Sequence, residues 1–266
     1  MIAGALIFAF NNEHTDYVAM ANWSAKNIKR HLNIPVCLVT NNEPVIGHLF
    51  DKVIIVNPSQ GGVRYFSDYD SNVTWHNTNR MDAYKLSPWD QTLVLDADYV
   101  IASNQLSTVL ESNQDFLCYR WATDITGLRT FNDLNYFGSH NMPMWWATVM
   151  MFRRSSKVEL LFDSMEMVRD NWTHYRNLYK NANPTYRNDH ALSIALNMLN
   201  GHTLQVNEIS GTLASITPEH TLTQLSQDLY RVDFLTPDKK ARWITLSKDF
   251  HAMGKQQLGA IVANPC

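Results

Sequence analysis

"QTLVLDADYV", residues 91–100, passes from four apolar or β-favouring residues into two aspartates separated by one alanine. Side chains alternate along a strand, so Asp96 and Asp98 are expected to point to one side while Ala97 points to the other. Two carboxylates this close repel each other unless a cation, a basic group or solvent relieves them. The stretch therefore predicts a buried strand that ends in a two-carboxylate grip for a divalent metal. A solvated loop after the strand is the alternative.

The sequence before this stretch alternates between strands and helices. Continuously apolar runs predict strands at residues 5–10, 34–40 and 51–56. A parallel sheet buries strands of this kind on both faces. Apolar residues at helical spacing predict a helix over residues 14–33, and a second helical stretch over residues 77–87 carries both Arg80 and Lys85. This alternation predicts an α/β fold with a twisted, mostly parallel sheet flanked by helices.

Polar residues follow two of these predicted strands. Asn11 and Asn12 come after the first strand, and Asp96 and Asp98 end a later one. Because ligands of such sheets bind beyond the carboxyl ends of the strands, we expect the four residues to line one crevice. The pair Asn11–Asn12 is equally typical of a simple turn.

Past residue 100 the pattern is looser. A helix or turn followed by a strand is predicted over residues 107–125, and a further strand over residues 144–152. The periodicity predicts a helix over residues 155–172, with Ser155 or Ser156 as its cap. A polar loop then leads into a last predicted helix at residues 188–199.

Composition narrows the class of protein. The chain has 266 residues, 45% of them hydrophobic, which is enough for one large or two small domains. A net charge of −3 argues against nonspecific binding of nucleic acid or of a membrane surface, although a local basic groove stays possible. The three cysteines are far apart, which fits a reducing, cytoplasmic environment. No run approaches the ~20 apolar residues that a membrane helix needs, and the opening "MIAGALIFAF" predicts a first strand rather than a signal peptide.

Three segments resemble the glycosyltransferases of family 8, the group of glycogenin and the bacterial lipopolysaccharide galactosyltransferases. "NTNRMDAYKLSPWDQTLVLDADYVI" (77–101) resembles the family segment in which an arginine and a proline precede a strand ending in Asp-x-Asp. "KDFHAMGK" (248–255) resembles the family's His-x-x-Gly motif, and "ALIFAFNNEHTDYVAMANWSAKNI" (5–28) its first strand and helix. The resemblance implies a GT-A fold in one domain over residues 1–266, with a nucleotide-binding half at 1–100 and an acceptor and sugar half at 101–266.

The resemblance also implies a site for a nucleoside diphosphate sugar and a divalent metal, usually Mn²⁺, with Mg²⁺ as the other choice. Asp96, Asp98 and His251 match the metal ligands, and an imidazole among carboxylates favours manganese. A structural histidine is the alternative for His251. The residues that match the nucleotide-sugar contacts are Phe10, Asn11, Asn12, Arg80, Asp96, Ala97, Gly254 and Lys255.

Three of these residues, and one neighbour, have an individual interpretation. Gly254 would let the backbone approach the diphosphate, and Lys255 would add positive charge there; a solvated side chain is the alternative for Lys255. Arg80 matches a contact to the donor sugar. For Lys85, four to five residues on, we favour a surface charge.

Other positions depart from the family pattern. "RNDHALS" (187–193) stands where the family has an Asp-Gln-Asp segment ahead of a helix, so that Asp189 and Asn188 would lie under the reacting face of the sugar. An Asn or Asp helix cap is the alternative. Gln257 replaces the family's lysine six residues after the histidine. Trp145 and Trp146 could stack on a sugar or, as we favour, fill the core.

Together these patterns predict a metal-dependent, retaining glycosyltransferase that moves a sugar from a UDP-type donor to an acceptor hydroxyl. The acceptor is a saccharide by default; a modified base in DNA is a second option. A nucleotidyltransferase would share the metal and diphosphate chemistry, but it would need a Gly-rich basic loop after the first strand, and "FNNEHTDY" (10–17) is not one. A catalytically silent nucleotide-sugar-binding protein is the remaining alternative.

Overall fold

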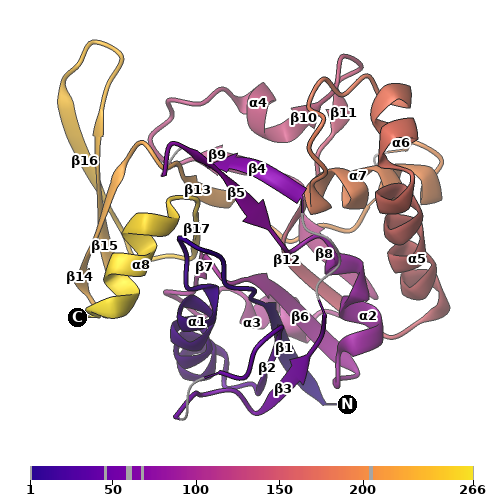
Figure 1. Ribbon diagram of the computed structural model, residues 1–266, viewed down its shortest axis with the longest axis horizontal. Coiled ribbons are helices and arrows are strands. Elements are labelled where there is room, and N and C mark those ends of the chain that lie inside the picture. Colours follow the sequence, from indigo (N-terminus) through magenta and orange to yellow (C-terminus); the bar gives the residue numbers. More distant parts are fainter. Residues whose placement is uncertain (1, 45–46, 58–61, 67–68, 204–205, 266) are drawn as a thin grey trace.

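A six-stranded sheet lies at the centre of the computed structural model, which describes residues 2–44, 47–57, 62–66, 69–203 and 206–265 (Figure 1). Its strand order is β3-β2-β1-β6-β12-β8; the first four strands run parallel, and β12 is antiparallel to both of its neighbours. The predicted α/β fold with a mainly parallel sheet is confirmed. The strands are β1 (Ala3–Phe8), β2 (Val36–Thr40), β3 (Lys52–Ile55), β6 (Gln91–Asp96), β8 (Phe116–Tyr119) and β12 (Trp146–Arg153).

Helices cover both faces of this sheet, which explains why its strands are apolar throughout. In β1, Ala5 and Ile7 belong to one buried cluster, whereas Leu6 and Phe8 belong to another. Helix α1 packs into the first cluster, and most of the buried residues of α5 pack into the second. The helices are α1 (Tyr17–Leu32), the 3-10 helix η1 (Arg80–Asp82), α2 (Ala83–Leu86), α3 (Ser107–Glu111), α4 (Phe131–Asn135), α5 (Ser156–Asp170), α6 (Trp172–Leu178), α7 (Asn188–Leu199) and α8 (Lys255–Ala263).

The long helices begin where local chemistry favours a start. The Ser155 side chain accepts a hydrogen bond from the Val158 amide at the start of α5, as predicted. The stretch over residues 77–87 is instead two short turns, η1 and α2, so Arg80 and Lys85 do not share one helix. It ends at Ser87, which is extended (ψ 130°) because the proline that follows disfavours a helical residue before it.

A second sheet, β7-β17-β13-β9, joins segments from the middle of the chain to segments from its last quarter. In it, β17 pairs antiparallel with β7, with His251 opposite Tyr99, and the Ala252 amide donates to the Asp98 carbonyl over 3.0 Å. This pairing places His251 beside the residues that end β6. The strands are β7 (Tyr99–Val100), β9 (Ala122–Asp124), β13 (Leu213–Ile216) and β17 (Phe250–Ala252).

Three smaller sheets complete the described part of the fold, and no sequence pattern predicted them. The three-stranded sheet packs one face on the core through Leu222, Tyr230 and Val232, and it exposes Trp243. Its β15–β16 hairpin projects from the body of the molecule at the left of Figure 1. The strands are β14 (Thr221–Ser226), β15 (Leu229–Leu235) and β16 (Ala241–Leu246), with the pairs β4 (Gly62–Phe66) and β5 (Ser71–Trp75), and β10 (Tyr136–Phe137) and β11 (Met142–Pro143).

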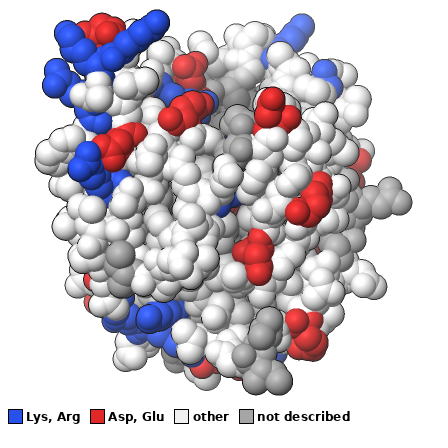
Figure 2. All heavy atoms as spheres, turned by 60° about the vertical axis from the view of Figure 1, so that its left-hand side comes forward, with Lys and Arg blue, Asp and Glu red and all other residues white. Residues whose placement is uncertain are grey.

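The surface carries charges of both signs. On the face shown in Figure 2, Lys and Arg side chains are mixed with Asp and Glu and leave much of the surface uncharged. Among the described residues, no helix is long and apolar enough to cross a membrane.

Candidate active site

A cavity of about 490 Å³ opens where β1 and β6 end and where the antiparallel β12 begins. The predicted site residues that line it are Phe10, Asn12, Arg80, Asp96, Ala97, Asp98, Asn188, Asp189, His251 and Lys255. Asn11 and Gly254 do not. Residues from the first ten positions to the last strand therefore meet in one place, as the rule for parallel sheets leads one to expect.

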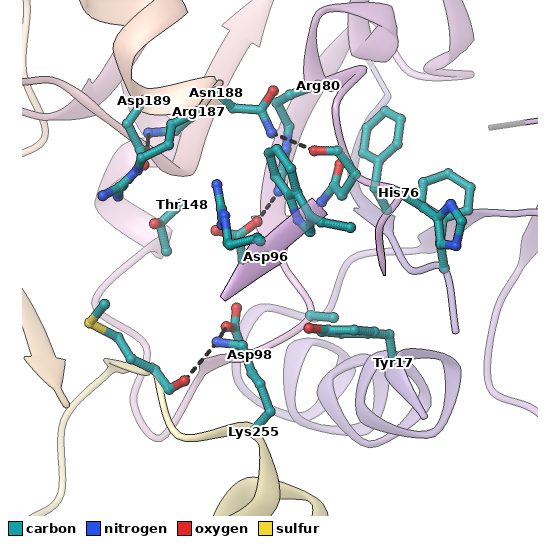
Figure 3. Close-up of a pocket in the computed structure, with 18 of the residues that line it drawn as sticks. Tyr17, His76, Arg80, Asp96, Asp98, Thr148, Arg187, Asn188, Asp189 and Lys255 are labelled. Carbon is teal, nitrogen blue, oxygen red and sulfur yellow. Dashed lines mark hydrogen bonds and ion pairs between the residues drawn. The ribbon is translucent and has the colours of Figure 1, made fainter. Parts of the chain in front are cut away.

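Two carboxylates and an imidazole converge in this cavity. Asp96 ends β6 and Asp98 lies in the turn before β7 (Figure 3), and His251 is in β17. One possible ligand atom from each lies within 4.8 Å of the other two. Ligands of a single Mg²⁺ at about 2.1 Å from the ion are at most about 4.2 Å apart, so small side-chain rotations would bring the three atoms onto one ion.

The donor set suits a hard divalent cation, with one departure. Two carboxylates and one imidazole fit manganese or magnesium. Metal-bound histidines usually donate from their second ring nitrogen, yet His251 Nδ1 is buried without a hydrogen-bond partner among the described residues. The carboxylate oxygens and His251 Nε2 can therefore serve as ligands, but the described residues provide no hydrogen-bond acceptor that would orient the imidazole through Nδ1.

Both carboxylates also face cations. Arg80, on η1, pairs with Asp96, and Lys255, the first residue of α8, pairs with Asp98. Burial raises the pKa of Asp98, but the charges of Lys255 and His251 outweigh it and hold that pKa well below its usual range. Burial lowers the pKa of Arg80 to about 10, so the guanidinium keeps its charge at neutral pH. A metal ion would compete with two cations for these carboxylates.

The start of α7 forms the opposite wall. The residue before the helix, Arg187, takes the capping position without a side-chain cap, so the interpretation of Asn188 or Asp189 as the cap is wrong. The Asp189 carboxylate accepts a hydrogen bond from the Ala147 amide (2.9 Å) and pairs with Arg187 (2.8 Å). Burial raises its pKa, but Arg187 and this amide outweigh burial, and the net shift is downward. Asn188 donates to the Asn77 carbonyl over 2.8 Å.

The two asparagines after β1 differ from each other. The Asn11 side chain accepts from the Val18 amide and donates to Asp16, so both ends of its amide serve the start of α1. The Asn12 oxygen accepts from two amides of its own turn, 2.9 and 3.0 Å away, and the residue still lines the cavity. The turn interpretation holds for both, and we leave Asn11 out of the site. Gly254 lies at the start of α8 with φ of −77°.

The structure decides between the two interpretations given for each of Lys85, Trp145 and Trp146. Lys85 pairs with Glu166 over 3.0 Å at the surface, as favoured. Trp145 and Trp146 are 1% and 3% exposed and fill the core, as favoured.

Several residues of the cavity were not predicted. Tyr17 begins α1, Thr148 lies near the start of β12, and Arg64 and His76 come from the β4–β5 hairpin and its end. Figure 3 shows Tyr17 on the same side of the cavity as Asp98 and Lys255, with Arg187 and Asp189 across from His76. No local pattern marks the hairpin residues, because they reach the site only through long-range packing.

No protein-family model and no curated protein matches the chain. Among solved structures, the glycosyltransferase GlyE of Streptococcus pneumoniae is 14% identical with a TM-score of 0.45, over 79% of this chain and 46% of GlyE, so this chain spans less than half of that protein. The galactosyltransferase LgtC is 11% identical with a TM-score of 0.49, over 73% of this chain and 70% of LgtC. A protein of Bacillus anthracis assigned as a glucose-1-phosphate thymidylyltransferase is 10% identical with a TM-score of 0.35, over 77% of this chain and 96% of that one.

Proposed function

We propose that this protein is a metal-dependent glycosyltransferase that moves a sugar from a nucleoside diphosphate donor, UDP-linked by preference, to an acceptor hydroxyl. The observation that carries the proposal is the convergence of Asp96, Asp98 and His251 in a cavity at the carboxyl ends of parallel strands. The family resemblance of the sequence suggests the same chemistry, a GT-A type of fold, and retention of configuration at the sugar.

The metal and the cations have one common task in this proposal. Asp96, Asp98 and His251 would hold Mn²⁺ or Mg²⁺, which supplies positive charge to the diphosphate as the glycosidic bond breaks. Arg80 and Lys255, which pair with the two carboxylates, lie close enough to share that task. Charge placed in advance where negative charge develops stabilises the transition state without reorganisation.

Asp189 and Asn188 would act on the sugar. Asp189 is ionised and held from two sides, by Arg187 and by the Ala147 amide, so its charge has a fixed position. A fixed negative charge beside a reacting sugar stabilises the positive charge that develops on its ring. Asn188, anchored to the Asn77 carbonyl, would orient the sugar with its remaining polar atoms. A saccharide is the default acceptor, and a modified DNA base is the other candidate.

The protein is incubated without acceptor with each of a panel of UDP-, GDP- and dTDP-sugars, in the presence of Mn²⁺, Mg²⁺ or EDTA. Mass spectrometry identifies the product released from each donor. Slow, metal-dependent release of a nucleoside diphosphate from one donor, lost by at least about 100-fold in Asp98→Asn, is expected. The matched control is Asp238→Asn, an exposed carboxylate in the β15–β16 turn, which should keep full activity.

Each rival function has its own outcome. A nucleotidyltransferase would release pyrophosphate from a nucleoside triphosphate and a sugar phosphate. A silent binding protein would show metal-dependent binding of a donor and no release of a nucleoside diphosphate, either without acceptor or after saccharide acceptors are added. Absence of any metal-dependent binding would contradict the assignment of Asp96, Asp98 and His251 as metal ligands.

A further inference from the structure

The charges that line the cavity do not balance, and the surplus lies on one residue. Among the described residues that line the cavity, four cationic side chains face three carboxylates, the cations being Arg64, Arg80, Arg187 and Lys255 and the carboxylates Asp96, Asp98 and Asp189. Arg80, Arg187 and Lys255 each pair with one carboxylate. Among the residues that the structure describes, no carboxylate forms an ion pair with Arg64.

This surplus remains when the proposed ligands are added. A divalent ion brings two positive charges, and the diphosphate of a nucleotide sugar brings two negative ones. The ion pairs of Arg80 and Lys255 with the metal-binding carboxylates are neutral in sum, as is the pair of Arg187 with Asp189. The charge of Arg64 is then the one left over among the described lining residues.

Arg64 is also held in a way that leaves donors available. Its guanidinium stacks on the Trp75 ring at 3.9 Å from the ring centre and donates to the Tyr186 carbonyl over 3.3 Å. A guanidinium has five N–H donors, and this is the hydrogen bond that the described residues give it. Burial lowers its pKa to about 10, and it is charged at neutral pH. The stack on Trp75 fixes the plane of the guanidinium, and a fixed plane favours bidentate hydrogen bonding to a carboxylate or a phosphate.

The contacts of Arg64 place it near the start of α7. Its hydrogen bond goes to the Tyr186 carbonyl, two residues before α7 begins, on the side of the cavity where the sugar and the acceptor would meet. We propose that Arg64 binds an anionic group, a carboxylate or a phosphate, that the substrate carries in addition to the diphosphate. The inference rests on the proposed function and deepens it. The substrate class is then either an acidic donor sugar or an acidic or phosphorylated acceptor.

Two binding series distinguish these sources. In the donor series, calorimetry with Mn²⁺ compares UDP-glucose with UDP-glucuronate and UDP-galactose with UDP-galacturonate. In the acceptor series, the protein saturated with UDP and Mn²⁺ is titrated with glucose, galactose and their 6-phosphates. Each series uses the wild type, Arg64→Met, which keeps an apolar stem over Trp75, and Arg64→Lys, which keeps the charge.

In one of the series the wild type is expected to bind the anionic member at least about 10-fold more tightly than its neutral match, as one charge-assisted hydrogen bond provides. Arg64→Met removes this preference without weakening the neutral member, and Arg64→Lys keeps part of it. A preference in neither series, or an equal loss for neutral and anionic ligands in Arg64→Met, overturns the assignment. If neutral UDP-sugars bind with Mn²⁺ and no anionic preference exists, this inference alone fails; if no UDP-sugar binds, the proposed function fails with it.

Discussion

His190 shows how burial, more than neighbouring charges, sets the charge of a residue next to the site. It is 4% exposed and stacks between Phe137 and Trp172, with ring centres 4.8 and 5.8 Å away. Burial lowers its pKa to about 3, whereas the unfolded chain keeps the ordinary value of about 6.5. As the pH falls below 6.5, only the unfolded state takes up this proton, so stability is lost by about 1.4 kcal/mol per pH unit.

His190→Gln should remove this contribution to the pH dependence. We expect the stability difference between wild type and variant to shrink by roughly 2 kcal/mol between pH 7.5 and pH 5, because the variant has no proton to bind. Urea unfolding at both pH values measures it. Parallel loss of stability in the two proteins would mean that His190 takes up its proton over the same pH range in the folded state as in the unfolded state.

Gly4, in β1, is a residue whose identity follows from one neighbour. A Cβ built on it would lie 2.4–2.6 Å from atoms of the Trp89 ring, which in turn donates to the Ala5 carbonyl over 3.3 Å. Gly4→Ala is therefore expected to displace the indole and to cost about 1–3 kcal/mol of unfolding free energy.

A matched control for this substitution exists in α8. A Cβ on Gly259 would meet its nearest neighbour, Met20 Cε, at 3.5 Å, an ordinary contact. Gly259→Ala is expected to be neutral or stabilising by up to about 1 kcal/mol. Urea unfolding of both variants tests the pair, and equal stability of Gly4→Ala and wild type would contradict the close approach.

At the scale of elements, Gln257 explains one departure from the family pattern. Its side chain on α8 accepts from the Leu222 amide and donates to the Pro218 carbonyl (3.2 Å), and so ties the helix to β14. A lysine can donate but cannot accept. Gln257→Lys, which restores the family residue, should leave the Leu222 amide unpaired and lose about 1–3 kcal/mol.

The control for this prediction is Gln257→Glu, which keeps the acceptor. We expect it to retain more stability in urea unfolding than Gln257→Lys. Equal losses would show that the amide finds another partner and that the tie between α8 and β14 contributes little.

The helices and strands that could be predicted from the sequence are those in which apolar residues form a continuous run or recur at a regular spacing. Buried parallel strands and the helices α1, α5 and α7 have runs or repeats long enough to identify. The β4–β5 hairpin and the β14–β16 sheet gave no such signal, and the antiparallel direction of β12 is set by tertiary pairing. That direction brings Ala147 and Thr148 to the cavity from the beginning of a strand, which a rule about strand ends does not anticipate.

The same distinction holds for the site. Asp96 and Asp98 could be predicted from two aspartates at the end of a buried strand, and His251 from its resemblance to a motif. Strand alternation does not hold as far as Asp98, because β6 ends at Asp96 and Asp98 lies in the turn, where Ala97 also lines the cavity. Arg64 and His76 could not, because a hairpin with no periodic pattern carries them. Their position depends on where the β4–β5 hairpin packs, and the residues next to them in the sequence do not determine that packing.

For the whole molecule, metal binding and stability should be linked through Lys255. Its side chain and that of Asp98 are 11% and 9% exposed, and breaking a buried pair costs about 3–5 kcal/mol. Lys255→Met should therefore destabilise the metal-free protein. Because the lysine also competes with the metal for Asp98, Mn²⁺ should raise the melting temperature of the variant by more than that of wild type.

Thermal unfolding with Mn²⁺ or EDTA measures this linkage. A ligand at 100 times its Kd adds about 2.7 kcal/mol to the free energy of unfolding, so the effect is within reach of the method. Asp98→Asn provides the comparison, since it should show no manganese-dependent shift. A smaller manganese shift in Lys255→Met than in wild type would mean that Lys255 assists the ion instead of competing with it.

The pairing of β7 with β17 also determines when the protein can first function. Asp98 and His251 are separated by more than half of the chain, and His251 reaches its place when β17 pairs with β7 and with β13. A ribosome adds about 5–20 residues per second, so on the order of ten seconds pass between the synthesis of the carboxylates and that of the imidazole. The parallel strands β1, β2, β3 and β6 can assemble during that time. A nascent chain halted before residue 250 would thus carry all six strands of the central sheet but only two of the three proposed metal ligands.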